Sequence, residues 1–240
     1  MTVTQQLSSD LPAFHQGGAA HWSALPGILA ALEQSVGPHV RSMETGCGAS
    51  TVVFAAGGGE HTVISPDGRE HELVRSYCDE QRIDHSRVTF VADSSDRVLP
   101  RIATPGSIDL AFIDGAHSFP YAIVDWHYLS LALKVGGRML VDDVAIPAIT
   151  PLFHFMNSDA AWRYESLPDN RAALFTKLAE PAAVEDYTKQ PYNRRSDYSF
   201  APPLTRARLV GESIATRSRR SVGRRIPALR TVYRRLNEQR

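Results

Sequence analysis

The chain has 240 residues, of which 43% are hydrophobic and 22% charged, and its formal net charge is zero. This composition is typical of a globular domain, and a chain of this length can bury enough surface to fold without disulfides. Its two cysteines, Cys47 and Cys78, provide neither a disulfide framework nor a metal-binding pair, which favours a reducing compartment. No basic start precedes an apolar run, and no apolar stretch reaches about 18 residues, so we expect a cytoplasmic protein without signal peptide or membrane span.

The charge is distributed unevenly along the chain. Leu204–Arg240 contains eleven arginines and two glutamates, a net charge of +9, so residues 1–203 carry −9. The segment before this basic region is rich in proline, which is typical of a linker. We therefore predict a folded domain over 1–178, a linker over 179–203 and a basic tail over 204–240.

β-rich runs alternate with helix-like segments between Val40 and Lys177, which predicts βαβ units around a mostly parallel sheet. A helix over Trp22–Ser35 is expected to precede them. Pro168-Asp169-Asn170, a turn sequence without an intervening helix, separates the last two strands and predicts one antiparallel strand at an edge. The expected fold is α/β, a Rossmann-like doubly wound sheet of seven strands: Val40–Glu44, His61–Ser65, Arg87–Val91, Ile108–Asp114, Gly137–Asp142, Trp162–Leu167 and Arg171–Lys177.

The clearest helix is expected to follow Ser118, a good N-cap, with Pro120 in its first turn. Gly136-Gly137 is expected to end it. Apolar and small residues recur at helical spacing and predict the face toward the sheet: Phe119, Ile123, Trp126, Ser130 and Leu133.

The segment Met43–Thr51 contains a glycine-rich turn between the first strand and a helix. Gly46 and Gly48 allow a ligand to approach the backbone, and the helix beginning near Ser50 presents free N–H groups. This arrangement predicts a nucleotide-type binding turn. Thr51 stands where a dinucleotide fingerprint has glycine or alanine, which argues against NAD.

The pattern Glu-x-Gly-x-Gly-x-Ser in this turn resembles motif I of the class I S-adenosylmethionine-dependent methyltransferases. The resemblance extends over about Val40–Lys177. It implies S-adenosyl-L-methionine as cofactor, with contacts from Glu44, Gly46, Gly48 and Ser50. A tight turn without a ligand is the alternative interpretation.

The family places an acid at the end of the second strand, where a carboxylate accepts hydrogen bonds from both ribose hydroxyls. Ser65 occupies that position here, so Asp67 is the candidate ribose ligand, with a turn-forming role as its alternative. After the third strand, Asp93, Ser94 and Ser95 match the segment that contacts adenine. The same residues are also typical of a helix cap.

Two further apolar strands end in acids, Asp114 after the fourth and Asp142-Asp143 after the fifth. Because the carboxyl ends of neighbouring strands form the crevice of an open α/β sheet, these acids should lie together near the glycine turn. Asp143 can join the other two only if the chain turns at the strand end. Clustered carboxylates require protonation or a cation, and Mg²⁺ prefers oxygen ligands. Asp114, Asp142 and Asp143 are therefore the predicted ligands of Mg²⁺ or another divalent cation.

This set of acids resembles the metal-dependent O-methyltransferases of the catechol O-methyltransferase type, and related bacterial small-molecule enzymes carry the same Asp-Gly-x-His sequence. The resemblance implies that His117 replaces a catalytic lysine as general base, removing a proton from a metal-bound hydroxyl. Alternatively, Asp114 contacts the cofactor, Asp142 and Asp143 are solvated loop acids, and His117 bonds a backbone carbonyl.

The basic tail contains an apolar stripe surrounded by arginines, which predicts an amphipathic helix; with Pro227 as its first residue, the ordered part would be Pro227–Gln239. Such a helix suits an anionic membrane, nucleic acid, or the acidic body of its own or a partner subunit, and a solvated tail is the alternative. The stripe consists of Val222, Ile226, Leu229, Tyr233 and Leu236.

The sequence thus predicts a class I methyltransferase that performs Mg²⁺-assisted O-methylation of a small-molecule hydroxyl. The alternatives are a metal-independent N- or O-methyltransferase, a non-catalytic binding module that uses the arginine-rich tail, and an NAD-dependent enzyme. We expect the acceptor between Phe14–Trp22 and Ile146–Asn157, and a homo-oligomer is compatible with the sequence.

Overall fold

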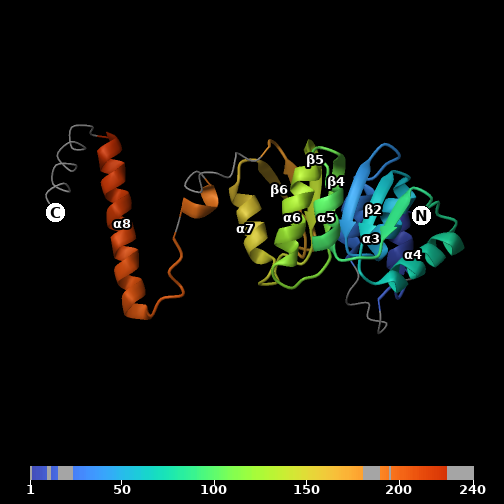
Figure 1. The fold of residues 1–240 in the computed structure, drawn as a ribbon, viewed down its shortest axis with the longest axis horizontal. Helices are drawn as coiled ribbons and strands as arrows, with labels where there is room; N and C mark the ends of the chain where they lie inside the picture. The colour runs from blue at the N-terminus through green and yellow to red at the C-terminus, as the bar shows by residue number, and fades with distance from the viewer. Residues whose placement is uncertain (1, 10–11, 16–23, 181–189, 195, 226–240) are drawn as a thin grey trace. The chain divides into compact units, whose positions relative to one another are not determined.

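The computed structural model describes residues 2–9, 12–15, 24–180, 190–194 and 196–225. It divides into two compact units, Met1–Glu185 and Asp186–Arg240. The first unit contains the sheet and its helices (Figure 1). The second contains a short 3-10 helix, η3 (Pro191–Arg194), and the helix α8 (Pro203–Arg225). The predicted stripe from Val222 to Leu236 falls outside the side chains that the structure describes.

The sheet has seven strands in the order β3-β2-β1-β4-β5-β7-β6, which confirms the predicted fold class. The first five are mutually parallel, whereas β7 runs antiparallel to both of its neighbours. The antiparallel strand therefore lies second from the edge, and β6 forms the edge itself. The strands are β1 (Arg41–Thr45), β2 (Glu60–Ile64), β3 (Val88–Val91), β4 (Ile108–Ile113), β5 (Leu133–Val141), β6 (Trp162–Ser166) and β7 (Ala173–Lys177).

Helices cover both faces of the sheet, because α1 to α4 share one hydrophobic cluster with it and α5 to α7 share another. None of the helices in the described residues combines the length and apolar character that a membrane span requires. The helix expected over Trp22–Ser35 is shorter, beginning at Pro26. The helices are α1 (Val3–Ser9), α2 (Pro26–Glu33), α3 (Ala49–Gly57), α4 (Gly68–Gln81), α5 (Ser95–Ile102), α6 (Tyr121–Ala132) and α7 (Thr150–Ser158).

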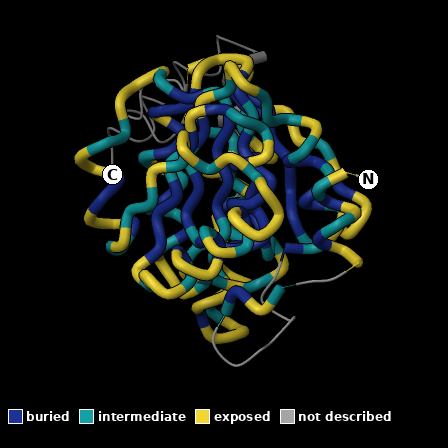
Figure 2. Tube along the Cα trace, turned by 90° about the vertical axis from the view of Figure 1, so that its right-hand side faces the viewer, coloured by how far each residue is buried: buried dark blue, intermediate teal, exposed yellow. Residues whose placement is uncertain are grey.

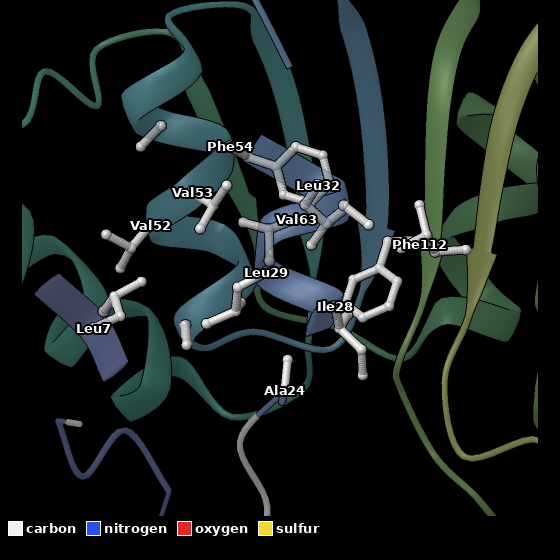
Figure 3. Packing of buried hydrophobic residues seen from close by; sticks show 14 of the residues in the cluster. Leu7, Ala24, Ile28, Leu29, Leu32, Val52, Val53, Phe54, Val63 and Phe112 are labelled. Carbon is white, nitrogen blue, oxygen red and sulfur yellow. The ribbon is translucent and has the colours of Figure 1, made fainter. Parts of the chain in front are cut away.

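The core between α2, α3 and the sheet fixes the elements that flank the glycine turn. Leu29 and Leu32 of α2 point toward Phe54 of α3, Val63 of β2 and Phe112 of β4 (Figure 3). Buried segments run through the interior, and exposed segments lie on the turns and outer helix faces (Figure 2). Close packing on both faces holds the strand ends in place.

The helix α6 differs from its sequence-based prediction at both ends. It begins at Tyr121 rather than directly after Ser118, and Phe119 precedes it with 69% of its surface exposed. It ends at Ala132, before Gly136-Gly137, because Leu133 already has an extended backbone and starts β5. Four residues of the predicted face do lie toward the core, since Ser130 and Leu133 are buried and Ile123 and Trp126 pack against the core cluster. The buried residues of α6 are Ala122, Asp125, Leu129, Ser130 and Ala132.

Asp125 is a fully buried acid on this face of α6. Burial raises its pKa to about 6, and the hydroxyls of Ser95 and Thr45 oppose this rise. A Cβ added to Gly115 would lie 3.5 Å from its Oδ2. A charged carboxylate in this position is costly, so the neutral form is favoured in the folded protein.

We predict that Asp125→Asn stabilises the protein more at pH 8 than at pH 5. The folded-state pKa lies above the unfolded-state value, so the unfolded chain loses its proton first as the pH rises. The side chain therefore costs stability increasingly above about pH 4, reaching on the order of 3 kcal/mol once the pH exceeds the folded-state value. Urea unfolding at both pH values measures the difference. Glu80→Gln, at an exposed position of α4, is the control, and an equal effect of Asp125→Asn at both pH values would contradict this prediction.

Candidate functional site

A cavity of about 780 Å³ lies at the carboxyl ends of β1, β2 and β4. This is where the strand order reverses, between β1 and β4, the usual ligand position in open α/β sheets. Its wall is formed by the turn after β1, the ends of β2 and β4, the start of α4, and His15. The lining residues are His15, Ala24, Thr45, Gly46, Cys47, Gly48, Ala49, Ser50, Ile64, Ser65, Pro66, Asp67, Glu70, Ser94, Ser95, Asp114, Gly115, Ala116, His117, Ser118 and Tyr121.

Gly46 brings the glycine turn against the end of β4. Its φ is +94°, and a Cβ there would lie 2.2 Å from the carbonyl oxygen of Asp114. Only glycine fits such a position. The Gly46 N–H donates to the Ile64 carbonyl at 2.9 Å, and the Asp114 N–H donates to the Thr45 carbonyl at 3.0 Å. The turn is therefore tied to the ends of both neighbouring strands.

Glu44 is fully buried and supports the turn from behind. Its Oε2 accepts a hydrogen bond from Ser50 Oγ at 2.7 Å. Its Oε1 accepts one from Thr51 Oγ1 at 2.5 Å and lies 3.1 Å from His61 Nε2. Ser50 lines the cavity and Glu44 does not. Glu44 thus fixes the turn, and its carboxylate oxygens are already engaged within the protein.

The end of β2 reaches a carboxylate through Ser65. Ser65 Oγ donates to Glu70 Oε2 at 2.9 Å, and Glu70 Oε1 lies 2.7 Å from His15 Nδ1. This contact with Glu70 is the main reason that the pKa of His15 is raised, with burial opposing it. Asp67 also lines the cavity, but its carboxylate accepts the Arg69 N–H at 2.9 Å and caps α4. Glu70 is the acid at this wall that the sequence reading missed.

The predicted adenine segment after β3 is divided between the cavity and the surface. Ser94 and Ser95 line the cavity, whereas Asp93 does not. The Asp93 carboxylate accepts the Ser94 N–H at 2.7 Å and pairs with Arg97 and Arg101 at 3.7 and 3.4 Å. The two serines are therefore placed to contact a ligand, and Asp93 orders the start of α5.

The acids after β4 and β5 lie together around His117, as expected. His117 Nε2 is 3.4 Å from Asp114 Oδ1, and its Nδ1 is 3.2 Å from Asp143 Oδ2. Asp143 joins the cluster because its φ of 52° turns the chain directly after Asp142. The contact with Asp114 is the main reason that the pKa of His117 is raised, with burial opposing it. His117 and Asp114 line the cavity, and the other two acids lie behind them.

Burial acts on two of these acids. It raises the pKa of Asp114 to about 7, against the hydrogen bond with His117. It also raises the pKa of Asp142, which is fully buried, while the positive charge of Arg171 opposes the change. The negative charge of Asp142 adds to the rise in the pKa of Asp114. Neighbouring carboxylates thus oppose each other's ionisation in this cluster.

Arg171, which the sequence reading missed, is the cation of this cluster. Its Nη2 lies 2.9 Å from Asp142 Oδ2, and its Nε lies 2.8 Å from Asp143 Oδ1. No group of three or more His, Cys, Asp or Glu side chains in the described residues is arranged to hold a metal ion. As they are placed, Asp114, Asp142 and Asp143 do not fit Mg²⁺, because two of these three already bind a guanidinium group.

The pairing of β7 with β5 places Arg171 beside the acids, and no local sequence pattern indicates this pairing. The start of β7 pairs with the end of β5, with Ala173 opposite Val141. Residues just before Ala173 therefore meet the acids that follow Val141. For Glu70, the signal is its place in the first turn of α4, three residues after the cap Asp67.

Comparisons with known proteins identify chains of similar sequence or fold. Residues 43–144 match the family model of a methyltransferase domain. No curated protein matches the sequence significantly.

Several solved structures share the fold at low sequence identity. A candidate O-methyltransferase from Klebsiella pneumoniae is 17% identical, with a TM-score of 0.56 over 73% of this chain and 95% of its own. A candidate caffeoyl-CoA O-methyltransferase from Staphylococcus aureus is 12% identical, with a TM-score of 0.57 over 74% and 93%. The Podospora anserina methyltransferase PaMTH1, bound to S-adenosylhomocysteine (SAH), is 14% identical. Its TM-score is 0.52 over 74% of this chain and 86% of its own.

The family match covers the stretch from β1 to the acids after β5, which contains the glycine turn and most of the cavity wall. The sheet order and helix arrangement are those of a Rossmann-like α/β fold. Residues 43–144 of this chain are therefore similar to a methyltransferase domain, and the chain shares its fold with the solved structures named above.

Proposed function

We propose that this protein transfers the methyl group of S-adenosyl-L-methionine to the oxygen of a small-molecule hydroxyl. One observation carries the proposal: a single cavity has the glycine turn at one wall and His117 with Asp114 at another. The match to a methyltransferase domain supports the reaction class. The SAH bound to the similar fold of PaMTH1 supports the cofactor, and the O-methyltransferases among the similar structures support oxygen as acceptor.

The walls of the cavity offer the contacts that such a cofactor requires. Gly46 and Gly48 let the backbone approach it closely. Glu70, which Ser65 contacts, is the proposed ribose ligand in place of the acid expected at the end of β2. A carboxylate can accept hydrogen bonds from both ribose hydroxyls. Ser94 and Ser95 stand where the adenine edge is expected.

His117 is the proposed general base. Its Nδ1 faces Asp143, which favours the tautomer with hydrogen on Nδ1 and leaves Nε2 as the basic atom. Nε2 lies 3.4 Å from Asp114 Oδ1, a longer separation than the 3.2 Å between Nδ1 and Asp143 Oδ2. The cofactor supplies an electrophilic methyl group on a sulfonium. As the acceptor oxygen bonds to that methyl and the carbon–sulfur bond breaks, Nε2 takes the hydroxyl proton.

The cofactor contact is tested by titrating S-adenosylhomocysteine into the protein by calorimetry, with NAD as comparator. We expect micromolar binding, about −8 kcal/mol, for the former alone. Glu70→Gln should weaken it about tenfold, or about 1.4 kcal/mol, because an amide accepts from the ribose less strongly than a carboxylate.

Glu72→Gln is the matched control, since Glu72 is exposed and pairs with Arg75 outside the cavity. Absence of binding by the wild type would refute the cofactor assignment. Normal affinity in Glu70→Gln would refute only the role of Glu70.

The proposed base is tested with His117→Ala. We expect turnover to fall by about 10² to 10⁴ while the affinity for S-adenosylhomocysteine stays nearly unchanged, since a base acts on the acceptor proton. The assay measures the formation of S-adenosylhomocysteine from S-adenosyl-L-methionine in the presence of each acceptor from a panel of phenols, catechols and sugars.

His127→Ala changes an exposed histidine of α6 and should leave turnover unchanged. If His117→Ala retained full turnover with the accepted substrate, the imidazole would have no part in proton removal.

A further inference from the structure

The acids behind the cavity have a cation partner from within the chain. Arg171 lies between β6 and β7, and its Nη2 is 2.9 Å from Asp142 while its Nε is 2.8 Å from Asp143. Asp142 is fully buried, and the side chains of Arg171 and Asp143 are each 21% exposed. A planar guanidinium suits two carboxylates held in this way.

All four carboxylate oxygens of these acids have partners. Asp142 Oδ1 accepts the Asp143 N–H at 2.7 Å, and its Oδ2 binds Arg171. Asp143 Oδ1 binds Arg171 Nε, and its Oδ2 faces both Arg171 Nη2 at 3.4 Å and His117 Nδ1 at 3.2 Å. A divalent ion could reach these oxygens only by displacing Arg171.

The backbone also holds Arg171 in this position. Its carbonyl accepts the N–H of Val144 at 3.0 Å, which links it to the chain just after the acids. The preceding Asn170 has a φ of 49°, and its N–H donates to the Leu167 carbonyl at 3.1 Å. Backbone hydrogen bonds therefore fix the turn that carries the Arg171 side chain.

We propose that Arg171 is the built-in cation of this site: it occupies the position of a divalent ion, balances Asp142 and Asp143, and holds Asp143 against His117. The acid cluster of the native protein consequently binds no divalent cation. The proposal rests on the proposed function only in placing the cluster beside the acceptor. Its test measures cation binding, so it can fail or succeed independently of methyl transfer.

The experiment titrates Mn²⁺ alone into the full-length protein and follows free Mn²⁺ by electron paramagnetic resonance. The wild type should show no binding at this cluster up to millimolar concentration. Arg171→Gln releases carboxylate oxygens beside Asp114 and should gain a site at least about tenfold tighter than any in the wild type. Mn²⁺ should also raise the Tm of this variant and not that of the wild type.

Arg163→Gln is the matched control, because Arg163 is exposed on β6 and pairs with Glu165, outside the acid cluster. It should not gain a Mn²⁺ site. Wild-type Mn²⁺ binding that is lost in Asp143→Asn would overturn the proposal, and this measurement does not depend on the folding of any Arg171 variant. A folded Arg171→Gln protein that binds no Mn²⁺ would overturn it as well.

Discussion

The buried carboxylate of Glu44 is the constraint on which the site depends. An unpaired charge in this position would cost several kcal/mol, so its oxygens require donors. Ser50, Thr51 and His61 surround it, and His61 in turn contacts Ser42 at 2.8 Å. These contacts join β1, β2 and the first turn of α3 into one unit. The turn between β1 and α3 is thereby held by contacts within the protein itself.

The glycine turn and the acid cluster are parts of the same rigid structure. Gly46 packs on the carbonyl of Asp114, so the proposed cofactor turn is in direct contact with the strand end that carries the proposed acceptor site. A side chain at position 46 would displace the end of β4 together with Asp114 and His117. Under the proposed function such a shift would disturb the alignment of donor and acceptor, where a misplacement of about 1 Å can lower the rate about 100-fold.

Most of the fold and part of the site could be predicted from the sequence. These features, the β-rich runs and the acids at the strand ends, are encoded by residues that are adjacent in the chain. The seven strands and the meeting of Asp114, His117 and Asp143 are of this kind. Arg171 depends on the pairing of β7 with β5, which a single sequence does not reveal. The burial of Asp125 in α6 was not predicted, because a hydrophobicity pattern treats an aspartate as a surface residue.

A fixed guanidinium changes the chemistry available at the acceptor. A divalent ion that binds a hydroxyl can lower the pKa of that hydroxyl strongly, as it does for bound water, whose pKa falls to about 7. Arg171 is held by two carboxylates behind His117 and lies outside the cavity lining, so it does not offer an empty coordination position to the acceptor. Under this proposal, proton removal depends on the acceptor's own acidity. A phenol, with a pKa of about 10 like tyrosine, suits such a site better than a sugar hydroxyl, whose acidity is closer to that of water.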